Sequence, residues 1–362
     1  MEPVHIEVRH ADGRGYPIDL AEGLGLRLLA ALDALGVGAQ RVFVSTAPIW
    51  RTVRHLLPEG LPDADVVLMA DGERHKQLPA VSRLYDALMR AGADRATTVV
   101  AIGGGVVGDT AGFAAATYMR GLPIVHVPTT LVAQVDSAVG GKVGVNHPLA
   151  KNLVGAFHRP RAVLADPRFL ATLPRREFRA GLYEVVKYGA IASVELYTRV
   201  SLDLRALFAR SPEALLPVIT DCCRIKARVV TADEHEAGER RVLNFGHTAG
   251  HALEALTKYR RFRHGEAVGY GMLVAARLAV ARGAMSADDC EALARLITRM
   301  GPLPPVADLA ADEALEAMRL DKKVVARRLH FVLPRRIGAV EVVDDVTDAE
   351  LRAAMVATGL RG

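Results

Sequence analysis

Residues 97–109 read Thr97-Thr98-Val99-Val100-Ala101-Ile102-Gly103-Gly104-Gly105-Val106-Val107-Gly108-Asp109. The first six are rich in β-branched side chains and predict a strand. A Gly-x-Gly-x-x-Gly turn follows, and the pattern predicts a helix over Thr110–Met119. A strand that leads through such a turn into a helix lets backbone N–H groups approach a pyrophosphate. The same glycines also occur in purely structural tight turns, but the surrounding segments favour a dinucleotide-binding site.

The acidic residue expected about 20 positions downstream of this turn, for the ribose hydroxyl, is absent near Pro128. A candidate lies upstream instead, in Asp71-Gly72-Glu73-Arg74-His75-Lys76, after the apolar run 66–70. There Glu73 can accept from a ribose hydroxyl while Lys76 meets phosphate. The loops Thr129-Thr130 and Gly140-Gly141-Lys142 add further polar groups.

Length and composition limit the classes of protein. With 362 residues the chain is long enough for two domains, and 46 Lys and Arg against 41 Asp and Glu give a net charge of +5. The excess is spread along the chain with few aromatic residues near it, so we expect no nucleic-acid partner. No apolar run approaches the length of a membrane span. Three cysteines make no disulfide framework, and we expect a cytoplasmic protein.

The pattern of hydrophobic residues changes along the chain. Up to about Asp166, strand-like runs alternate with helical patterns, and from Arg175 onward helices dominate. We therefore predict an α/β Rossmann-like dinucleotide-binding domain at 1–173 and a mainly α-helical metal-binding domain at 174–362. The predicted strands are 5–9, 41–45, 65–70, 97–102, 123–127, 162–165, 329–333 and 339–343, and the predicted helices of the first domain include 20–35, 79–91 and 110–119.

The helical half contains a cluster of histidines. His247 and His251 are four residues apart, so they share one helix face, and His264 follows thirteen residues after His251. Three imidazoles can therefore converge. A catalytic zinc site of this kind also needs a carboxylate, and Glu184 is the candidate because it lies in a mostly apolar helix with Lys187 three residues on. The alternative is a Glu184–Lys187 ion pair beside ordinary core histidines.

Basic residues also occur near these motifs, where a substrate with phosphate and carboxylate groups would need them. Taken singly, each is better explained as a solvated surface charge. They are Arg120, Lys142, Lys151, Lys187, Lys226, Arg240, Lys322 and Lys323.

Taken together, these motifs resemble the 3-dehydroquinate synthase family, in order and at the spacing of that family, over roughly residues 40 to 345. The matching runs are 103–109, 114–121, 127–131, 134–137, 140–142, 146–148, 151–153, 184–189, 243–248 and 264–266.

The resemblance implies an enzyme of the shikimate pathway that converts 3-deoxy-D-arabino-heptulosonate 7-phosphate (DAHP) to 3-dehydroquinate and phosphate. The family uses NAD⁺ catalytically with one Zn²⁺, or Co²⁺ in its place. In that scheme C5 is oxidised, phosphate leaves by β-elimination, the ketone is reduced again, and an intramolecular aldol step closes the ring. The resemblance also implies a homodimer.

The resemblance further implies roles for individual residues. The metal ligands would be Glu184, His247 and His264, with His251 as a non-ligand that assists proton transfer. Substrate would meet Asp136, Lys142, Asn152, Lys187, Lys226, Arg240, Asn244 and one of Lys322 or Lys323, and Arg120 would bind phosphate across a dimer interface. NAD⁺ would meet Asp71, Gly72, Glu73, Arg74, His75, Lys76, Gly105, Val106, Val107, Gly108, Asp109, Thr129, Thr130, Lys142, Lys151, Phe169, Leu170, Ala171 and Thr172.

Two residues depart from the family pattern. Glu239 stands where an apolar residue usually precedes Arg240, and His126 replaces a common Gln. Neither change removes an expected ligand, although Glu239 could compete for Arg240.

Three other functions remain open from the sequence. Another sugar-phosphate cyclase, of the 2-epi-5-epi-valiolone or 2-deoxy-scyllo-inosose synthase type, is the nearest rival, but those relatives usually differ at Asn152, Arg240 and Asn244. A metal-dependent polyol dehydrogenase would leave the basic residues without a partner. A catalytically silent NAD-binding protein would not need the set Glu184, His247 and His264.

Overall fold

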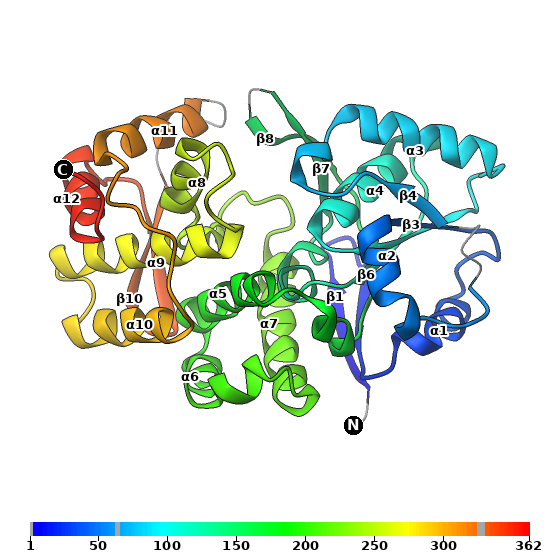
Figure 1. Cartoon of the computed structure of the whole chain (residues 1–362), viewed down its shortest axis with the longest axis horizontal. Helices are drawn as coiled ribbons and strands as arrows, with labels where there is room; N and C mark the ends of the chain where they lie inside the picture. The colour runs from blue at the N-terminus through cyan, green and yellow to red at the C-terminus, as the bar shows by residue number, and fades with distance from the viewer. Residues whose placement is uncertain (1–2, 62–65, 149, 324–329) are drawn as a thin grey trace. The chain divides into compact units, whose positions relative to one another are not determined.

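The computed structural model describes residues 3–61, 66–148, 150–323 and 330–362, the side chains of 150 and 320–323 excepted. The chain forms two compact units (Figure 1). The first, called here the sheet unit, comprises Met1–Pro174 and Arg210–His235. The second, the helical unit, comprises Arg175–Ala209 and Glu236–Gly362.

A seven-stranded sheet in the order β1-β2-β9-β6-β5-β3-β4 organises the sheet unit. All neighbouring strands are parallel except the antiparallel pair β1 and β2. Two further strands, β7 and β8, form an antiparallel hairpin. The bounds are β1 Val4–Arg9, β2 Gly15–Leu20, β3 Arg41–Thr46, β4 Val66–Met69, β5 Thr98–Gly103, β6 Ile124–Pro128, β7 Lys142–His147, β8 Ala150–Phe157 and β9 Ala162–Ala165.

Helices cover both faces of this sheet, and the alternation of side chains along β3 shows how. Val42 and Val44 pack with Leu84 of α3 (Leu78–Arg90), in a cluster that also includes α4 (Gly105–Thr117). Phe43 points the other way and packs with α1 (Leu28–Ala34) and with Trp50 of α2 (Ala47–Val53). Because successive strand residues face opposite sides, both faces must be apolar, and β5 is buried along its whole length.

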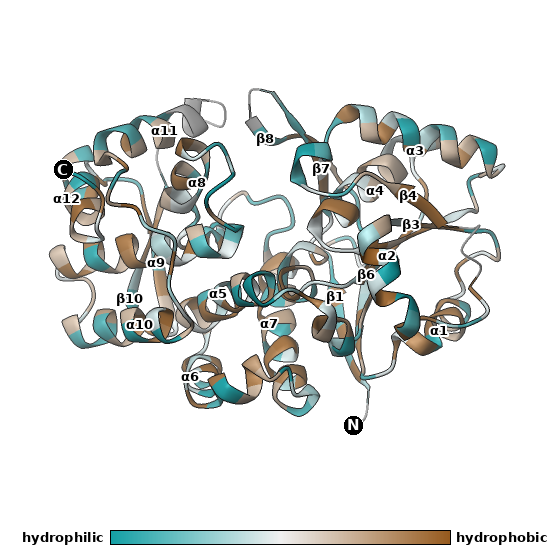
Figure 2. Ribbon diagram, viewed as in Figure 1, coloured by the Kyte–Doolittle hydropathy of each residue, from teal (hydrophilic) through white to brown (hydrophobic). Residues whose placement is uncertain are grey.

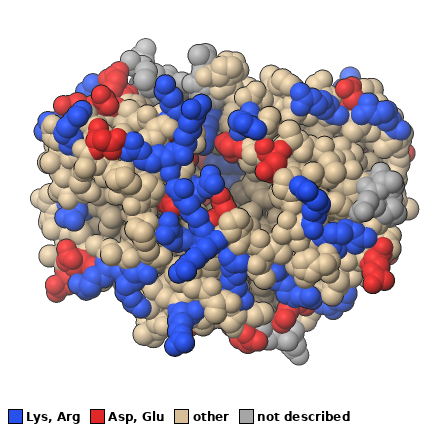
Figure 3. Space-filling view, viewed as in Figure 1, with Lys and Arg blue, Asp and Glu red and all other residues tan. Residues whose placement is uncertain are grey.

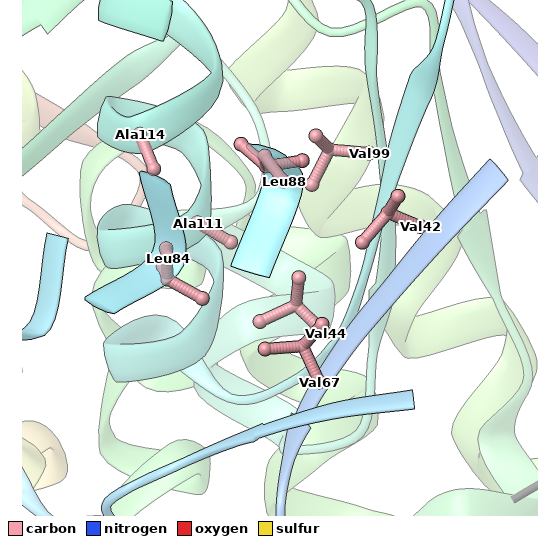
Figure 4. A pocket seen from close by; sticks show the side chains of 8 residues that line it. All are labelled: Val42, Val44, Val67, Leu84, Leu88, Val99, Ala111 and Ala114. Carbon is pink, nitrogen blue, oxygen red and sulfur yellow. The ribbon is translucent and has the colours of Figure 1, made fainter. Parts of the chain in front are cut away.

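A small cavity lies within the first of these clusters, between β3, β4, β5, α3 and α4 (Figure 4). Its lining is entirely aliphatic: Val42, Val44, Val67, Leu84, Leu88, Val99, Ala111 and Ala114. With no polar group to hold a ligand in place, it is a packing feature of the core.

One helix from the second half of the chain belongs to the sheet unit. Helix α7, Pro212–Ala232, packs against β1, β2 and the short π-helix Ala133–Ser137. The chain thus leaves the sheet unit after Pro174 and returns at Arg210. The predicted domain boundary between residues 173 and 174 does not include the return of the chain to the sheet unit at Arg210.

The helical unit is built around α9, His264–Ala281, which contacts five other elements of the unit and is apolar over most of its surface. In Figure 2 α9 is largely pale to brown, whereas α10 carries more hydrophilic residues. The remaining elements are α5 Arg175–Ala192, α6 Val194–Phe208, α8 His247–Leu256, α10 Ala287–Arg299, α11 Ala311–Lys323, the hairpin β10 Phe331–Arg336 and β11 Ala339–Val343, and α12 Asp348–Ala357.

The predicted fold class is confirmed: a parallel α/β unit is combined with a mainly helical one. Some elements differ in detail. The predicted helix 20–35 is shorter because β2 continues to Leu20, where it pairs with β9, and regular α-helix begins at Leu28. Helix α4 begins directly at Gly105 in the glycine turn. The hairpin β7–β8 was not among the predicted strands.

The structure also shows how charged side chains, apolar helices and cysteines are distributed. On the face shown in Figure 3, basic side chains are interrupted by acidic ones. Among the described residues, no helix combines the length and apolar character that crossing a membrane requires. The three cysteines, Cys222, Cys223 and Cys290, are buried and free.

Candidate active site

Close helix packing brings the predicted metal ligands together. Helix α9 meets α5 at Gly265, where any Cβ would overlap the carbonyl oxygen of Ala180, so the helices can approach only because this residue is glycine. Gly246, just before α8, has φ +78° and a Cβ there would lie 2.7 Å from the carbonyl oxygen of Val268. Glycine adopts this left-handed conformation without steric cost. The start of α8 is therefore held against α9.

These packings place Glu184 of α5, His247 of α8 and His264 of α9 around one point. Glu184 Oε1 lies 3.7 Å from His247 Nε2 and 3.4 Å from His264 Nε2. All three side chains can offer one ligand atom within a common 4.8 Å. In a tetrahedral zinc site, bonds of about 2.0–2.1 Å place ligand atoms about 3.3 Å apart. The observed separations fit a single bound cation.

The hydrogen bonding of Glu184 is unusual for a buried carboxylate. It is fully buried, and neither oxygen accepts a well-aligned hydrogen bond from the described residues. Lys187 Nζ, itself buried, lies 2.6 Å from Oε2, so the ion pair weighed as the alternative does form. Oε1, however, faces the two imidazoles, and a carboxylate in this position is costly to bury without a further positive partner. The donor set therefore fits a divalent metal.

The protonation of the two histidines follows from their neighbours. His247 Nδ1 lies 3.1 Å from the carbonyl oxygen of Phe245, which can only accept, so Nδ1 carries the proton and Nε2 presents its lone pair. Burial, followed by the charge of Lys187, lowers the pKa of His247 to about 3. This histidine is neutral, as a metal ligand must be.

The surroundings of His264 favour a positive charge. Burial opposes it, but Glu184 and Glu254 outweigh burial and raise the pKa of His264 to about 10. For Glu184, burial is likewise the largest effect and opposes ionisation, but Lys187 and the two histidines together hold the pKa of this carboxyl below its usual range. Without a metal, the Glu184 carboxylate thus faces a neutral His247 and a protonated His264, and a bound cation would replace the proton on Nε2 of His264.

Ion pairs fix the helix that supplies His264. Glu266, two residues further on, is fully buried and accepts from Arg176 at 2.6 and 2.8 Å and from Arg179 at 2.9 Å. Its carboxylate also accepts from the backbone N–H of Arg263 at 2.9 Å and so caps α9. Because both arginines lie on α5, these contacts lock the start of α9 onto the helix that bears Glu184.

His251 lies beside this cluster and at its exposed edge. Its ring centroid is 5.5 Å from that of His247 and 5.8 Å from that of His264. The predicted convergence of three imidazoles is therefore present. A second group of ligand atoms, from His251, Glu254 and His264, also gathers here. The sequence analysis did not single out Glu254, although it shares a face of α8 with His247 and His251.

In the sheet unit, the residues predicted to bind NAD⁺ follow the carboxyl ends of parallel strands. Residues 71–76 come after β4, 105–109 after β5, Thr129 and Thr130 after β6, and 169–172 after β9. Between β3 and β5 the strand order reverses, which is where open α/β sheets bind ligands.

The glycine turn after β5 has no side chains that would keep a ligand away from its backbone. A Cβ on Gly104 would lie 2.8 Å from the side chain of Thr130, so only glycine fits. Gly104 is also the N-cap residue of α4, and no described side chain caps this helix end. The first N–H groups of α4 are therefore available to an anion such as a pyrophosphate.

A network of polar side chains connects the predicted NAD⁺ and substrate residues of the sheet unit. Lys76 Nζ is buried and lies 2.5 Å from both Asp109 Oδ2 and Asn152 Oδ1. Asn146 donates to Glu73 Oε1 at 2.7 Å and accepts from the backbone N–H of Asn152 at 3.0 Å. Asn146 was quoted as part of a family motif but not predicted as a site residue. Asn146 thus connects Glu73, the candidate for binding the ribose, with Asn152, a candidate for binding the substrate.

Other predicted substrate residues pair within their own unit. Lys226 contacts both the side chain and the carbonyl oxygen of Asp136. In the helical unit, Asn244 donates to Glu236 Oε1 at 2.8 Å, and Arg240 is buried whereas Glu239 is exposed.

Some predicted residues lie apart from these groups. Arg120 follows the far end of α4, which at 13 residues separates it by about 20 Å from the glycine turn. The side chains of Phe169 and Leu170 are fully buried, whereas Ala171 is exposed. Lys142 and Lys151 lie on β7 and β8. The side chains of Lys322 and Lys323 fall outside the described residues.

Comparison with known families decides the relationship. The model of the 3-dehydroquinate synthase N-terminal domain matches residues 66–180, and that of the C-terminal domain matches residues 181–324. The chain belongs to the 3-dehydroquinate synthase family. Relatives named 3-dehydroquinate synthase include one from Pelotomaculum thermopropionicum, 47% identical over 93% of this chain and 92% of the relative. Another, from Saccharophagus degradans, is 42% identical over the whole of both chains.

Solved structures place this family member among sugar-phosphate cyclases. The 2-epi-5-epi-valiolone synthase of Streptomyces hygroscopicus subsp. jinggangensis, with NAD⁺ and Zn²⁺ bound, has a TM-score of 0.84 at 29% identity, covering 95% of this chain and 96% of its own. A 2-deoxy-scyllo-inosose synthase complexed with carbaglucose-6-phosphate, NAD⁺ and Co²⁺ also has a TM-score of 0.84, at 28% identity over 97% and 99%. Both of these cyclases thus bind NAD⁺ together with a divalent metal.

Proposed function

We propose that this protein converts DAHP to 3-dehydroquinate and phosphate with NAD⁺ and a divalent metal as cofactors. Full-length relatives at 42–47% identity carry the name 3-dehydroquinate synthase. The observation that carries the proposal is the convergence of Glu184, His247 and His264 on one buried point in a chain of this family.

Glu184, His247 and His264 would hold the metal. When bound, Zn²⁺ or Co²⁺ supplies a Lewis acid that lowers the pKa of a substrate hydroxyl at C5. His251 is exposed beside the ligands, so it can exchange a proton with solvent and pass it to or from the substrate. We assign it proton transfer rather than ligation.

NAD⁺ would bind along the carboxyl edge of the sheet and, when bound, would supply a reversible hydride acceptor. The N–H groups that open α4 bind the pyrophosphate, and Glu73 accepts from a ribose hydroxyl. The other contributors are the strand-end residues assigned above: Asp71, Gly72, Arg74, His75, Lys76, Gly105–Asp109, Thr129, Thr130, Lys142, Lys151 and Phe169–Thr172. Since Phe169 and Leu170 are buried, their contribution would come through the backbone.

Charged and amide side chains would bind the anionic sugar phosphate. In the sheet unit these are Asp136, Lys142, Asn152 and Lys226, and in the helical unit Lys187, Arg240 and Asn244. Lys226 and Asp136 contact each other, so the substrate would meet a preformed pair. Lys322 or Lys323 completes the set.

A cytoplasmic location accords with three buried free thiols.

Arg120 would serve the phosphate site of a second copy in a homodimer. Its distance along α4 from the glycine turn of its own chain supports this assignment.

The other sugar-phosphate cyclases remain the second candidate, and sequence identity disfavours them. The cyclase structures are 28–29% identical to this chain, well below the named 3-dehydroquinate synthases. A protein of Sinorhizobium meliloti described as a probable glycerol dehydrogenase is 18% identical with a TM-score of 0.62, which shows a shared fold alone.

The test is a competition between DAHP and sedoheptulose 7-phosphate on the purified full-length protein, with products identified by mass. We expect phosphate release from DAHP only, dependent on NAD⁺ and metal, without accumulation of free NADH, because the ketone is reduced again in each cycle. Turnover of sedoheptulose 7-phosphate would indicate a different cyclase. Stoichiometric NADH would indicate a dehydrogenase.

A further inference from the structure

Glu254 is a buried carboxylate that the proposed reaction does not use. It lies on α8, seven residues after His247 and three after His251, so all three share one helix face. Only 3% of its surface is exposed. Burying a carboxylate is costly unless a specific partner compensates. The partner therefore indicates why this position carries an acid.

That partner is a predicted metal ligand. Glu254 Oε2 lies 3.2 Å from Nδ1 of His264. The other nitrogen of the same ring, Nε2, lies 3.4 Å from Glu184 Oε1. An imidazole that donates through Nδ1 carries its lone pair on Nε2, so the contact with Glu254 fixes both the tautomer and the direction of that lone pair.

The second histidine ligand has an equivalent arrangement with a different acceptor. His247 Nδ1 faces the carbonyl oxygen of Phe245 at 3.1 Å, and its Nε2 also faces Glu184 Oε1. One ring is thus held by a neutral backbone group of its own segment. The other is held by a charged side chain from a neighbouring helix, which makes His264 the more strongly donating ligand.

The non-helical segment between α8 and α9 explains why a side chain from outside α9 is needed to orient the His264 ring. His264 is the first residue of α9, and the preceding residues 257–263 form no helix or strand. Its ring therefore relies on a contact from outside α9. Helices α8 and α9 pack closely, and Glu254 reaches across from α8.

We propose that Glu254 is a positioning residue that accepts the Nδ1 proton of His264 and directs its Nε2 at the metal position shared with Glu184 and His247. This inference rests on the proposed function, since it assumes the same metal site. Glu254 itself does not bind the ion.

The experiment measures metal affinity on the full-length protein, by competition with a zinc chelator. Glu254→Leu keeps the bulk but removes the acceptor, and we expect Zn²⁺ binding to weaken about 10- to 100-fold. Glu254→Gln keeps an acceptor but loses the charge, so it should recover part of the affinity. Glu291, an exposed residue of α10, provides the control, and Glu291→Leu should bind Zn²⁺ like the unmodified chain.

A second readout uses Co²⁺ in place of Zn²⁺. The visible absorption of bound Co²⁺ reports ligand geometry, so the bands should change in folded Glu254→Leu and be closer to the original in Glu254→Gln. A loss of packing alone would not alter the bands in this graded order.

The outcomes separate this inference from the proposed function. Unchanged Zn²⁺ affinity and unchanged Co²⁺ bands in folded Glu254→Leu would overturn the inference while Glu184→Ala still loses metal. Loss of metal as complete as in Glu184→Ala would also overturn it, because Glu254 would then be a ligand with His251 and His264. If Glu254→Leu fails to fold, Glu254→Gln decides: about tenfold weaker binding supports the role, and unchanged binding refutes it. Retention of metal by Glu184→Ala would instead refute the proposed site itself.

Discussion

The two units prepare their sites in opposite ways. In the sheet unit, site residues already satisfy one another: Lys76 pairs with Asp109, and Asn146 bonds Glu73. In the helical unit, Glu184 is buried with neither oxygen in a well-aligned hydrogen bond to a described residue. The first arrangement would hold a large ligand by many small contacts, whereas the second would be completed by a metal cation at Glu184 Oε1, since Lys187 contacts the other oxygen. Single substitutions in the network of the sheet unit should therefore have moderate effects, whereas loss of a metal ligand in the helical unit should abolish metal binding.

The largest effect is expected for Glu184→Ala. Removing the one carboxylate ligand leaves two imidazoles, so the protein should lose its metal. With it goes a Lewis-acid contribution of several kcal/mol, and kcat/KM should fall about 1,000-fold or more. Metal content by mass spectrometry and initial rates measure both losses, with exposed Glu291→Ala as the control. Full metal occupancy in the variant would show that the ligands lie elsewhere.

An intermediate effect is expected for Asn146→Ala in the sheet unit. The change removes one hydrogen bond to the Glu73 carboxylate and one to the backbone of Asn152. A hydrogen bond to a charged group contributes about 1.5–3 kcal/mol, so NAD⁺ affinity should fall about tenfold while metal binding is unaffected.

Titration calorimetry with NAD⁺ checks the value for Asn146→Ala. A matched control is Gln40→Ala, which removes amide hydrogen bonds to the backbone of residues 91 and 92 near the amino end of β3. If both variants bind NAD⁺ equally well, the network does not support the dinucleotide site.

The third effect, on folding stability and not on ligand binding, is the pH dependence that His126 of β6 contributes. Burial, with a smaller effect of His158, lowers the pKa of His126 from 6.5 to about 4. An unfolded chain takes up a proton as the pH falls below 6.5, and the folded chain does not, so folding loses stability between pH 6.5 and 4. At a pH of about 5 this loss amounts to about 2 kcal/mol.

His126→Gln, which introduces the residue common in the family, should remove that loss. Urea unfolding at neutral and mildly acidic pH would measure it, with exposed His55→Gln as the control. An equal fall in stability with and without His126 would refute the assignment.

Local sequence patterns predicted the fold class and the candidate metal ligands. They did not predict pairings between strands that are far apart in the sequence. The strand and glycine turn of residues 97–109 were evident because β-branched residues and glycines act locally. The end of β2 at Leu20 was not, since its pairing with β9 joins segments far apart in sequence. The hairpin β7–β8 contains two glycines and was assigned no strand from the sequence, but it packs on α4.

In the site, the spacing of His247 and His251 predicted a shared helix face, and the structure adds the convergence with Glu184. Glu254 escaped notice because an acid on a helix surface ordinarily faces solvent. Only the packing of α8 on α9 shows that it is buried. The roles assigned to all of these site residues, Lys142, Lys151 and Arg120 included, remain predictions.

The return of residues 210–235 to the sheet unit affects how the protein is made. Strand β1 is synthesised well before its covering helix α7, which lies about 200 residues further along the chain. At about 5–20 residues per second, translation takes roughly 10–40 s to supply it. During that interval the part of the sheet that α7 covers in the folded protein is exposed, and a chaperone can bind there. The sheet unit therefore has all of its elements only after residue 235 has been synthesised.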